Sequence, residues 1–278
     1  GLALALGAGG ARGVAHAAVL RALHRAGIRP EILVGCSVGA IVAAMHAAVG
    51  LDAEGLLEGA RLLTPGGLLY YALSRARLPW LSTVAHERAG GIPAFLRQLD
   101  AASFERLHHG IRRLAILTFD LRRFEEFLAV GGPGLPAPVP VAEAVKGSAA
   151  IPGLFLPLAA RTTAGRRWLV DAGWHTAVPV ERAFAPVVGA DRVIAVDLSI
   201  HVCLRQGRRS YWDRLQEACG DRLVILRPAV RGCGTLFVRP ADRDRLIEAG
   251  EEAVERALPR LRPLAAGASI RPVSVEGP

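Results

Sequence analysis

The sequence predicts a three-layer α/β/α fold with a mostly parallel central sheet and a helical cap region. Two observations lead to this prediction. Short apolar runs that favour strands alternate with helical patterns over residues 2–49, and further apolar runs return at 193–198 and 223–226. Such alternation is typical of a parallel sheet covered by helices on both faces, because a crossover between parallel strands usually contains a helix.

The amino-terminal elements follow from this pattern. A first strand is expected at residues 2–6 and leads into a glycine-rich loop at 7–13. Apolar residues then recur on one face of a helix over 14–26. A second strand at 32–34 is followed by a helical run at 40–49. We therefore expect two consecutive strand–helix units.

The pattern is less regular after this point. Glycine and proline interrupt residues 51–110, which we expect to form a mostly helical cap. We expect strands at 114–119 and 168–170, a loop at 131–140 and a terminal helix at 243–261 that Pro263 ends. The elements are expected to form one domain over residues 1–264, followed by a flexible tail at 265–278.

Composition excludes several classes of protein. Hydrophobic residues make up 51% of the 278 residues, which argues against disorder. No run of about 18 apolar residues predicts a membrane span. The formal net charge is +9, and arginine carries nearly all of the positive charge because Lys146 is the only lysine. A basic surface favours anionic membranes or nucleic acid, and a compositional bias spread over a solvated surface is the alternative.

The four cysteines form no C-x-x-C pair and have no spacing typical of a zinc site. We therefore expect free thiols in a reducing, cytoplasmic compartment. No pair of histidines has metal-ligand spacing with a supporting carboxylate, so no metal site is expected.

The sharpest motif is a G-x-S-x-G sequence after the second strand, in which Gly35 and Gly39 flank Ser37. A catalytic serine on a tight strand-to-helix turn needs very small neighbours two residues away. The turn points the hydroxyl out of the sheet at the amino end of a helix, where developing negative charge is favoured. The alternative is a structural turn in which Ser37 caps the helix.

The glycine-rich loop at 7–13 exposes backbone N–H groups that can hold a phosphate or a tetrahedral oxyanion. A Walker A motif would need Gly-Lys-Ser/Thr where Arg12-Gly13-Val14 stands. A dinucleotide fingerprint would need glycine or alanine in place of Arg12. Both mismatches argue against a nucleotide-binding function. A purely structural role of the loop remains an alternative.

A carboxylate stands at a third strand end, where Asp171 follows residues 168–170. A serine hydroxyl needs a base before it becomes a good nucleophile, and a carboxylate can supply one. Most carboxylates at strand ends instead cap a turn. Asp120 and Asp197 also end strands and compete with Asp171 for the role.

Taken in order, these motifs resemble the patatin-like phospholipase family. The family's glycine-rich loop is similar to Gly9-Gly10-Ala11-Arg12-Gly13, and its serine motif is similar to residues 35–39. Its Asp-Gly-Gly or Asp-Gly-Ala motif is similar to Asp171-Ala172-Gly173. Residues 148–157 and 189–197 also resemble family segments. Five motifs in the family's order are far more specific than any one of them.

The resemblance implies a lipid acyl hydrolase with a Ser–Asp dyad, in which Ser37 is the nucleophile and Asp171 the base. It also implies a lipid or acyl-ester substrate and no metal or other cofactor. Contact with an anionic membrane surface would suit such a substrate, whereas nucleic acid and nucleotides are not expected as partners.

The resemblance also assigns the glycine-rich loop a role. The backbone N–H groups of Gly9, Gly10 and Ala11 would stabilise the oxyanion. Arg12 would orient the loop, and contact with a head-group phosphate is the alternative role. Two departures from the family pattern are Ala8 and Ala172, which stand where glycine is usual. Ala8 would tighten the loop, whereas alanine at 172 would be costly if that position requires a positive φ.

Three alternatives remain at this point. A Ser–Asp–His triad would add His201 to Ser37 and Asp171, and His175 is a second candidate histidine. A catalytically weak or inactive lipid-binding domain could use the same fold, a reading that Ala172 favours. A nucleotide-binding domain is the third.

Overall fold

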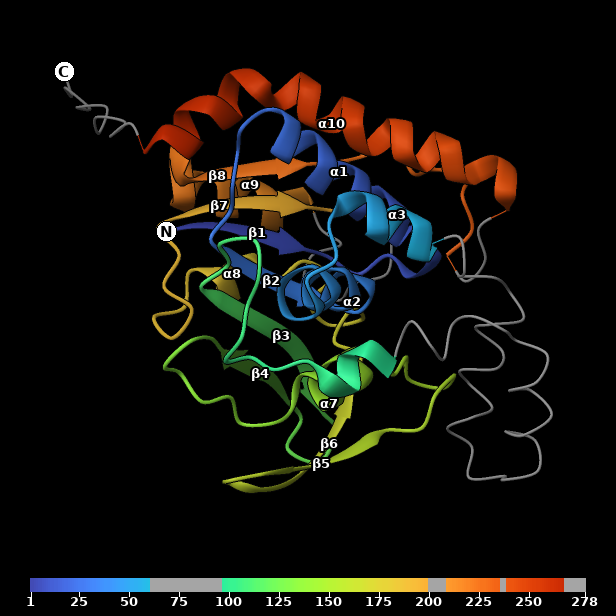
Figure 1. Ribbon diagram of the computed structural model, residues 1–278, viewed down its shortest axis with the longest axis vertical. Helices are drawn as coiled ribbons and strands as arrows, with labels where there is room; N and C mark the ends of the chain where they lie inside the picture. Colours follow the sequence, from blue (N-terminus) through green and yellow to red (C-terminus); the bar gives the residue numbers. More distant parts are fainter. Residues whose placement is uncertain (61–96, 200–208, 236–238, 268–278) are drawn as a thin grey trace.

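The computed structural model describes residues 1–60, 97–199, 209–235 and 239–267 (Figure 1). Within these residues, eight strands form one sheet in the order β5-β6-β3-β2-β1-β7-β8, with β4 paired to β3 off this path. The strands are β1 (Leu2–Leu6), β2 (Ile32–Cys36), β3 (Arg113–Asp120), β4 (Glu125–Gly131), β5 (Leu158–Thr162), β6 (Gly165–Val170), β7 (Arg192–Val196) and β8 (Leu223–Leu226).

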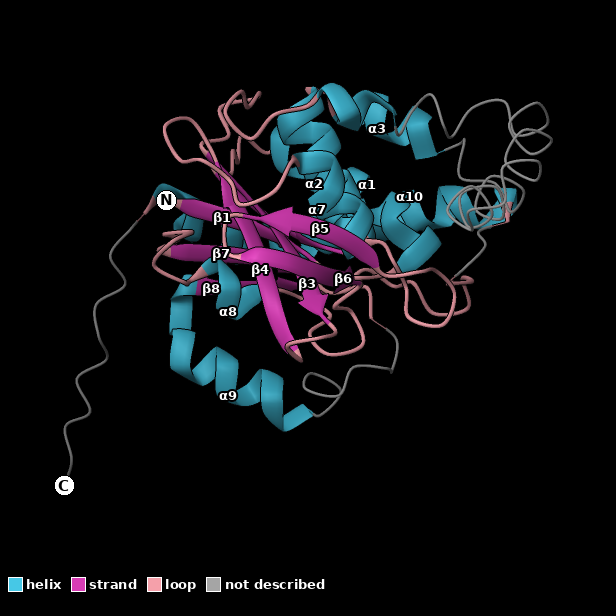
Figure 2. Cartoon of the chain, turned by 90° about the horizontal axis from the view of Figure 1, so that it is seen from below, coloured by secondary structure: helices cyan, strands magenta, loops and turns pink. Residues whose placement is uncertain are grey.

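Helices cover both faces of the sheet, so the predicted three-layer α/β/α fold is confirmed (Figure 2). Of the helices in the described part of the chain, five pack on one face: α1 (Val14–Arg25), α2 (Val38–Ala44), α3 (Ala53–Ala60), α7 (Val141–Ser148) and α10 (Pro240–Ala266). The other face carries α8 (Val180–Ala183) and α9 (Arg209–Cys219). Among the described helices, none combines the length and apolar composition that a membrane span requires.

Strand β1 shows why the sequence builds two cores. Successive side chains of a strand point to opposite faces of the sheet. Leu4 and Leu6 pack into the core beneath the larger helical layer, whereas Ala3 and Ala5 pack into the core beneath α8 and α9. All residues of β1 are buried, which is why the strand has no polar alternation in sequence.

The sheet is parallel through its centre and antiparallel at one side. Strands β3, β2, β1, β7 and β8 pair parallel with their neighbours. The pairs β3–β4, β3–β6 and β5–β6 are antiparallel. The sequence predicted neither β4 nor β5.

Strand β3 brings two distant parts of the chain together. Its pairing with β4 extends from Leu114 to Asp120 and occupies one edge of β3. On the opposite edge, β2 pairs only as far as Cys36 with Leu117, and β6 then pairs Val170 with Phe119. The ends of β2 and β6 therefore meet along the same edge of β3, so the residues that follow them become neighbours.

Several boundaries differ from the predicted ones. The helix expected at 40–49 begins at Val38 and changes at Met45 into a π-helix, Met45–Val49. The loop expected at 7–13 contains a 3-10 turn, Gly10–Gly13. The cap expected at 51–110 lies largely outside the described residues, and its described helical parts are α3 and a 3-10 turn, Gln98–Ala101.

The prediction that Pro263 ends the terminal helix is wrong. Helix α10 continues past Pro263 to Ala266 and stops at a left-handed Gly267. Proline removes one helical hydrogen bond. Leu261 and Leu264 are buried on either side of it, however, so packing of this face outweighs the lost bond. The expected tail from 265 therefore begins inside a helix, and residues 268–278 lie outside the described part of the chain.

Candidate active site

Ser37 occupies a strained turn between β2 and α2. Its φ of 57° and ψ of −125° lie in a region that non-glycine residues rarely adopt. A Cβ atom on Gly35 would lie 2.5 Å from the carbonyl oxygen of Gly39, and one on Gly39 would lie 2.1 Å from that of Leu6. Both glycines are therefore required by contact, in agreement with the need for small neighbours that the sequence indicated.

Ser148 fixes the backbone of this turn. The Ser148 hydroxyl accepts a hydrogen bond of 2.8 Å from the backbone N–H of Ser37 and donates one of 2.6 Å to the carbonyl of Leu117. Ser148 is the last residue of α7 and is fully buried. Ser148 lies in a segment that resembles the family, but its role has no sequence signature, because a hydrogen bond between residues so far apart in the chain leaves no local pattern.

Asp171 follows β6 and lies beside the turn. Its carboxylate accepts a hydrogen bond of 2.7 Å from the N–H of Gly173, and its own N–H donates to the carbonyl of Ala150 at 2.9 Å. Burial raises the pKa of Asp171 to about 6, although hydrogen bonds from the Ser37 side chain and the Gly173 backbone act to lower it. The structure therefore brings together a serine and a buried, unusually basic carboxylate.

Ala172 does not adopt a positive φ. Among the described residues, positive φ angles outside glycine occur only at Ser37, His109 and Phe124. The position of Ala172 therefore does not require the positive φ that would make alanine costly there. Glycine is needed instead at Gly173, where a Cβ would lie 2.7 Å from that of Ala8.

The glycine-rich loop lies against a second segment of the chain. The N–H of Ala11 donates to the carbonyl of Thr235 at 2.7 Å. This contact contradicts the expectation that Ala11 supplies an oxyanion donor, because its only backbone hydrogen is engaged. Of the predicted donors, Gly9 and Gly10 remain as candidates. Gly10 has a φ of +57°, and a Cβ there would lie 2.1 Å from the Thr235 oxygen.

Arg12 is buried behind the loop. Its Nε donates to the carbonyl of Gly9 at 3.0 Å, and its Nη1 is buried without a hydrogen-bond partner among the described residues. Burial lowers the pKa of Arg12, while attraction to Cys233 and Asp197 acts in the opposite direction. The contact with Gly9 is consistent with the predicted role of Arg12 in orienting the loop.

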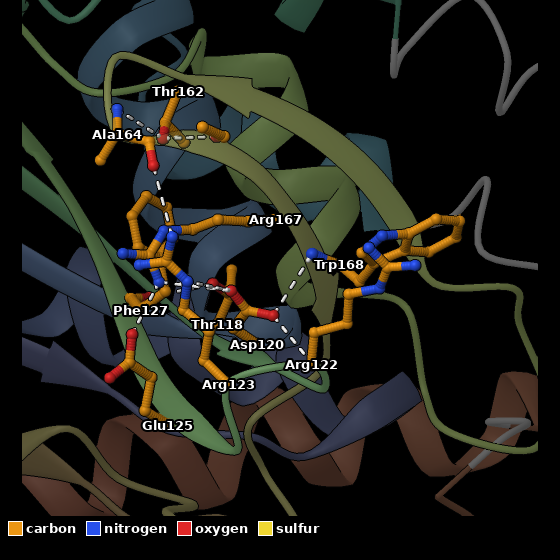
Figure 3. A network of polar contacts seen from close by, with 11 residues as sticks. Thr118, Asp120, Arg122, Arg123, Glu125, Phe127, Thr162, Ala164, Arg167 and Trp168 are labelled. Carbon is orange, nitrogen blue, oxygen red and sulfur yellow. Dashed lines mark hydrogen bonds and ion pairs between the residues drawn. The ribbon is translucent and has the colours of Figure 1, made fainter.

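The rival carboxylates are engaged elsewhere. Asp120 is fully buried and pairs with Arg167 at 3.3 Å (Figure 3). Asp197 accepts a hydrogen bond of 2.6 Å from Ser199 and pairs with Arg227 at 3.6 Å. Neither makes a described contact with Ser37.

The described histidines near the site also have other partners. The Nδ1 atom of His175 lies 2.9 Å from the carboxylate of Glu126. His16 contacts the Gly7 carbonyl at 2.7 Å, and burial lowers its pKa to about 4. His201 lies outside the described residues. Within the described residues, no group of histidine, cysteine and carboxylate side chains could hold a metal ion.

Comparisons with known proteins point to one family. A family model described as patatin-like phospholipase matches residues 4–184. An uncharacterized NTE family protein of Mycobacterium tuberculosis is 33% identical over 201 residues, which cover 71% of this chain and 49% of that protein. Lysophospholipase nte1 of Aspergillus fumigatus is 50% identical over 44 residues, 16% of this chain and 3% of that protein. The chain thus spans about half the length of the first of these relatives.

Solved structures share the fold at low sequence identity. VipD from Legionella pneumophila superposes with a TM-score of 0.51 at 15% identity, covering 93% of this chain and 66% of that one. Human GIVD cytosolic phospholipase A2 gives a TM-score of 0.51 at 14% identity, covering 95% and 60% of the two chains. At such identities the likeness shows the fold alone.

The contact between Gly10 and Thr235 predicts a large effect of substitution on stability. Gly10→Ala should lower the free energy of unfolding by roughly 2–5 kcal/mol, because it adds overlap with the Thr235 oxygen to the cost of a positive φ. Gly134→Ala is the matched control, since Gly134 has a φ of +73° and open space around it. We expect it to cost about 1–2 kcal/mol. Equal losses in urea titrations of the two variants would contradict the close contact at Gly10.

Proposed function

Because the chain belongs to the patatin-like phospholipase family, we propose that it hydrolyses carboxylic esters of lipids with Ser37 as nucleophile and Asp171 as base. One observation carries the proposal: a serine in a strained strand-to-helix turn lies beside a buried carboxylate whose pKa is raised to about 6. Strained residues and displaced pKa values both concentrate at functional sites.

The raised pKa of Asp171 suits it to proton transfer. An ordinary aspartate is too weak a base to take a proton from a serine hydroxyl efficiently. With a pKa of about 6, Asp171 is still mostly ionised at neutral pH and is a stronger base than an exposed carboxylate. A base whose pKa lies near the working pH gives the best compromise between ionisation and basicity.

In the first half of the reaction, Oγ of Ser37 attacks the ester carbonyl carbon while its proton passes to Asp171. The tetrahedral intermediate then expels the alcohol, which takes the proton from Asp171, and leaves an acyl-enzyme. In the second half, water attacks the acyl carbonyl and gives a proton to Asp171. Expulsion of Ser37 Oγ, which recovers the proton, releases the fatty acid.

The negative charge of each intermediate needs hydrogen-bond donors. We propose that the backbone N–H groups of Gly9 and Gly10 supply them, with Arg12 holding the loop through the Gly9 carbonyl. One preorganised donor can stabilise the transition state by about 3 kcal/mol. The chemistry proposed here requires neither metal nor nucleotide.

We also propose that residues 1–264 form one catalytic unit. The family match ends at residue 184, but β7 and β8 continue the same sheet. Buried residues of α10 belong to the same core as those of α1 and α2. The sheet edge that carries Ser37 would therefore depend on elements beyond the matched region.

The dyad can be tested by substitution. Ser37→Ala and Asp171→Asn should each lower kcat for p-nitrophenyl butyrate by several orders of magnitude, because one lacks the nucleophile and the other the basic lone pair. His175→Gln should cost roughly tenfold at most. Thermal unfolding of each variant is the control for folding. Substantial hydrolysis by the Ser37→Ala protein would remove Ser37 from the mechanism.

The hydroxyl of Ser148 should matter for catalysis through Ser37. Ser148→Ala leaves the Ser37 N–H without its partner, so we expect kcat to fall roughly 10- to 100-fold with little change in KM. Thr118→Val is the matched control, because Thr118 is equally buried and donates to the Phe127 carbonyl at 2.9 Å. Both substitutions should destabilise the fold by about 1–3 kcal/mol. If both lowered kcat equally, the loss would reflect general destabilisation instead of the turn.

The pKa of Asp171 predicts how activity depends on pH. Below about pH 6 the base is protonated, so kcat/KM should fall about tenfold for each further unit of pH. Stability should change in the opposite sense. Because the folded pKa of Asp171 is raised above its ordinary 3.8, the folded protein binds more protons than the unfolded chain between pH 4 and 6, and this contribution is lost as pH rises.

Asp171→Asn removes this titration and supplies the control. Relative to the asparagine variant, the wild-type protein should lose up to about 3 kcal/mol of unfolding free energy between pH 4 and 7. Chemical denaturation of both proteins at each pH measures the difference. A constant difference over this range would mean that the pKa of Asp171 is not raised.

A further inference from the structure

The turn between β3 and β4, residues 121–124, exposes apolar and cationic side chains together. Leu121 is 41% exposed and Phe124 is 74% exposed, and the exposed Arg122 and Arg123 lie between them. Phe124 also has a φ of +53°, where glycine or asparagine is usual. Neither the exposure nor the conformation of Phe124 is explained by folding of the turn, since a small polar residue would serve better.

The β3–β4 turn lies beside the proposed active site. It follows the carboxyl end of β3, the edge of the sheet at which Ser37 follows β2. The ring of Phe124 packs edge-on against buried Phe119 at 5.3 Å between centroids, and it lies 6.4 Å from the ring of Trp174. Trp174 is three residues beyond Asp171. A surface that contacts this turn therefore lies close to Ser37 and Asp171.

Exposed apolar side chains gather on this side of the described structure. Large exposed hydrophobic residues occur on the β3–β4 turn and on the loop between α7 and β5, which contains Leu154 and Leu156. That loop begins next to Asp171, because the carbonyl of Ala150 accepts its N–H. The remaining example in the described part of the chain is Val187, which precedes β7 at the opposite edge of the parallel strands.

A network of polar contacts around buried Asp120 holds the turn in shape (Figure 3). Asp120, the last residue of β3, accepts a hydrogen bond of 3.0 Å from the N–H of Arg122 and pairs with Arg167 of β6. Arg123 donates to the carbonyl of Ala164 in the β5–β6 turn at 3.3 Å. The guanidinium of Arg122 lies 5.3 Å from the ring of Trp168. The end of β3, strand β6 and the β5–β6 turn thus all contact the β3–β4 turn.

The charge of this region is positive. Residues 120–125 and 158–170, which contain the turn and the β5–β6 hairpin, include five arginines and two carboxylates. One of the carboxylates, Asp120, is buried and neutralised by Arg167. Apolar tips beside exposed arginines match an anionic bilayer, whose acyl chains accept the tips and whose phosphates attract the cations.

We propose that the β3–β4 turn docks this protein on anionic phospholipid bilayers, a role that rests on the proposed hydrolysis of lipids. Leu121 and Phe124 enter the acyl region, while Arg122 and Arg123 remain at the level of the phosphates. Docking by this turn brings the edge that holds Ser37 and Asp171 to the membrane surface. A substrate acyl chain then has a short path from the bilayer to the dyad.

Vesicle co-sedimentation in the Ser37→Ala background tests the proposal without any contribution from catalysis. The protein should bind phosphatidylcholine vesicles that contain phosphatidylglycerol more tightly than pure phosphatidylcholine vesicles, and salt should weaken the binding. The double substitution Leu121→Ser with Phe124→Ser should weaken binding by roughly tenfold or more, since each side chain loses its apolar transfer. Val187→Ser is the matched control and should change nothing.

Arg122→Gln tests the charged part of the turn. It should weaken binding to the anionic vesicles about fivefold, which corresponds to about 1 kcal/mol for one arginine near the surface. Binding to pure phosphatidylcholine should not change. Thermal unfolding should show that each variant is still folded at the temperature of the binding assay.

Two results would overturn the proposal. The first is equal vesicle binding by the turn variant and the Val187→Ser control. The second is a concentration-dependent dimer, seen by analytical ultracentrifugation, that the turn substitutions dissociate without affecting vesicle binding, because the turn would then contact a second copy of the chain. Either result leaves the roles of Ser37 and Asp171 untouched, since those depend on hydrolysis of a soluble ester.

Discussion

The edge of β3 that β2 and β6 share determines most of what this structure can do. Because β4 occupies the other edge throughout, the two strands meet end to end on the remaining one. Ser37 follows one strand and Asp171 follows the other. Residues that are far apart in sequence therefore become neighbours through backbone pairing, which positions them more precisely than flexible loops could.

The turn at Ser37 adds a local constraint. Its unusual φ and ψ persist because the surroundings leave no room for a relaxed alternative: Gly35 and Gly39 are in contact with backbone atoms, and Ser148 holds the Ser37 amide. At Asp171, burial destabilises the charged form of the side chain and thereby raises its pKa. Packing thus maintains both a strained serine and a basic carboxylate, and the proposed chemistry needs both.

The parts that the sequence predicted well are those with a local signature. Strand β1 is buried on both faces and is apolar at every position, so its bounds were predicted correctly. The need for Gly35 and Gly39 was predicted because each lies only two positions from Ser37 in the sequence. Strand β5 escaped notice because alternate positions are exposed and one is an arginine, so it lacks a continuous apolar run. The helix predicted for this segment ends too early, because the expectation that Pro263 ends it does not include the burial of Leu264.

Long-range contacts also limit how much of the candidate site can be predicted from the sequence. The Thr235 carbonyl that engages the Ala11 amide lies far along the chain, and so does Ser148 from Ser37. No spacing in the sequence could reveal either contact. The sequence also could not show whether alanine is tolerated at 172. The family pattern specifies glycine there, but the backbone φ, which only the structure gives, decides whether alanine fits.

A covalent label tests the central claim, that Ser37 is a nucleophile activated by Asp171, most directly. The protein is treated with a fluorophosphonate, and the site and rate of modification are determined by peptide mass spectrometry. We predict a single adduct on Ser37. It should form rapidly in the wild-type protein and far more slowly in the Asp171→Asn variant. Absence of an adduct on Ser37, or an equal rate in both proteins, would contradict the account.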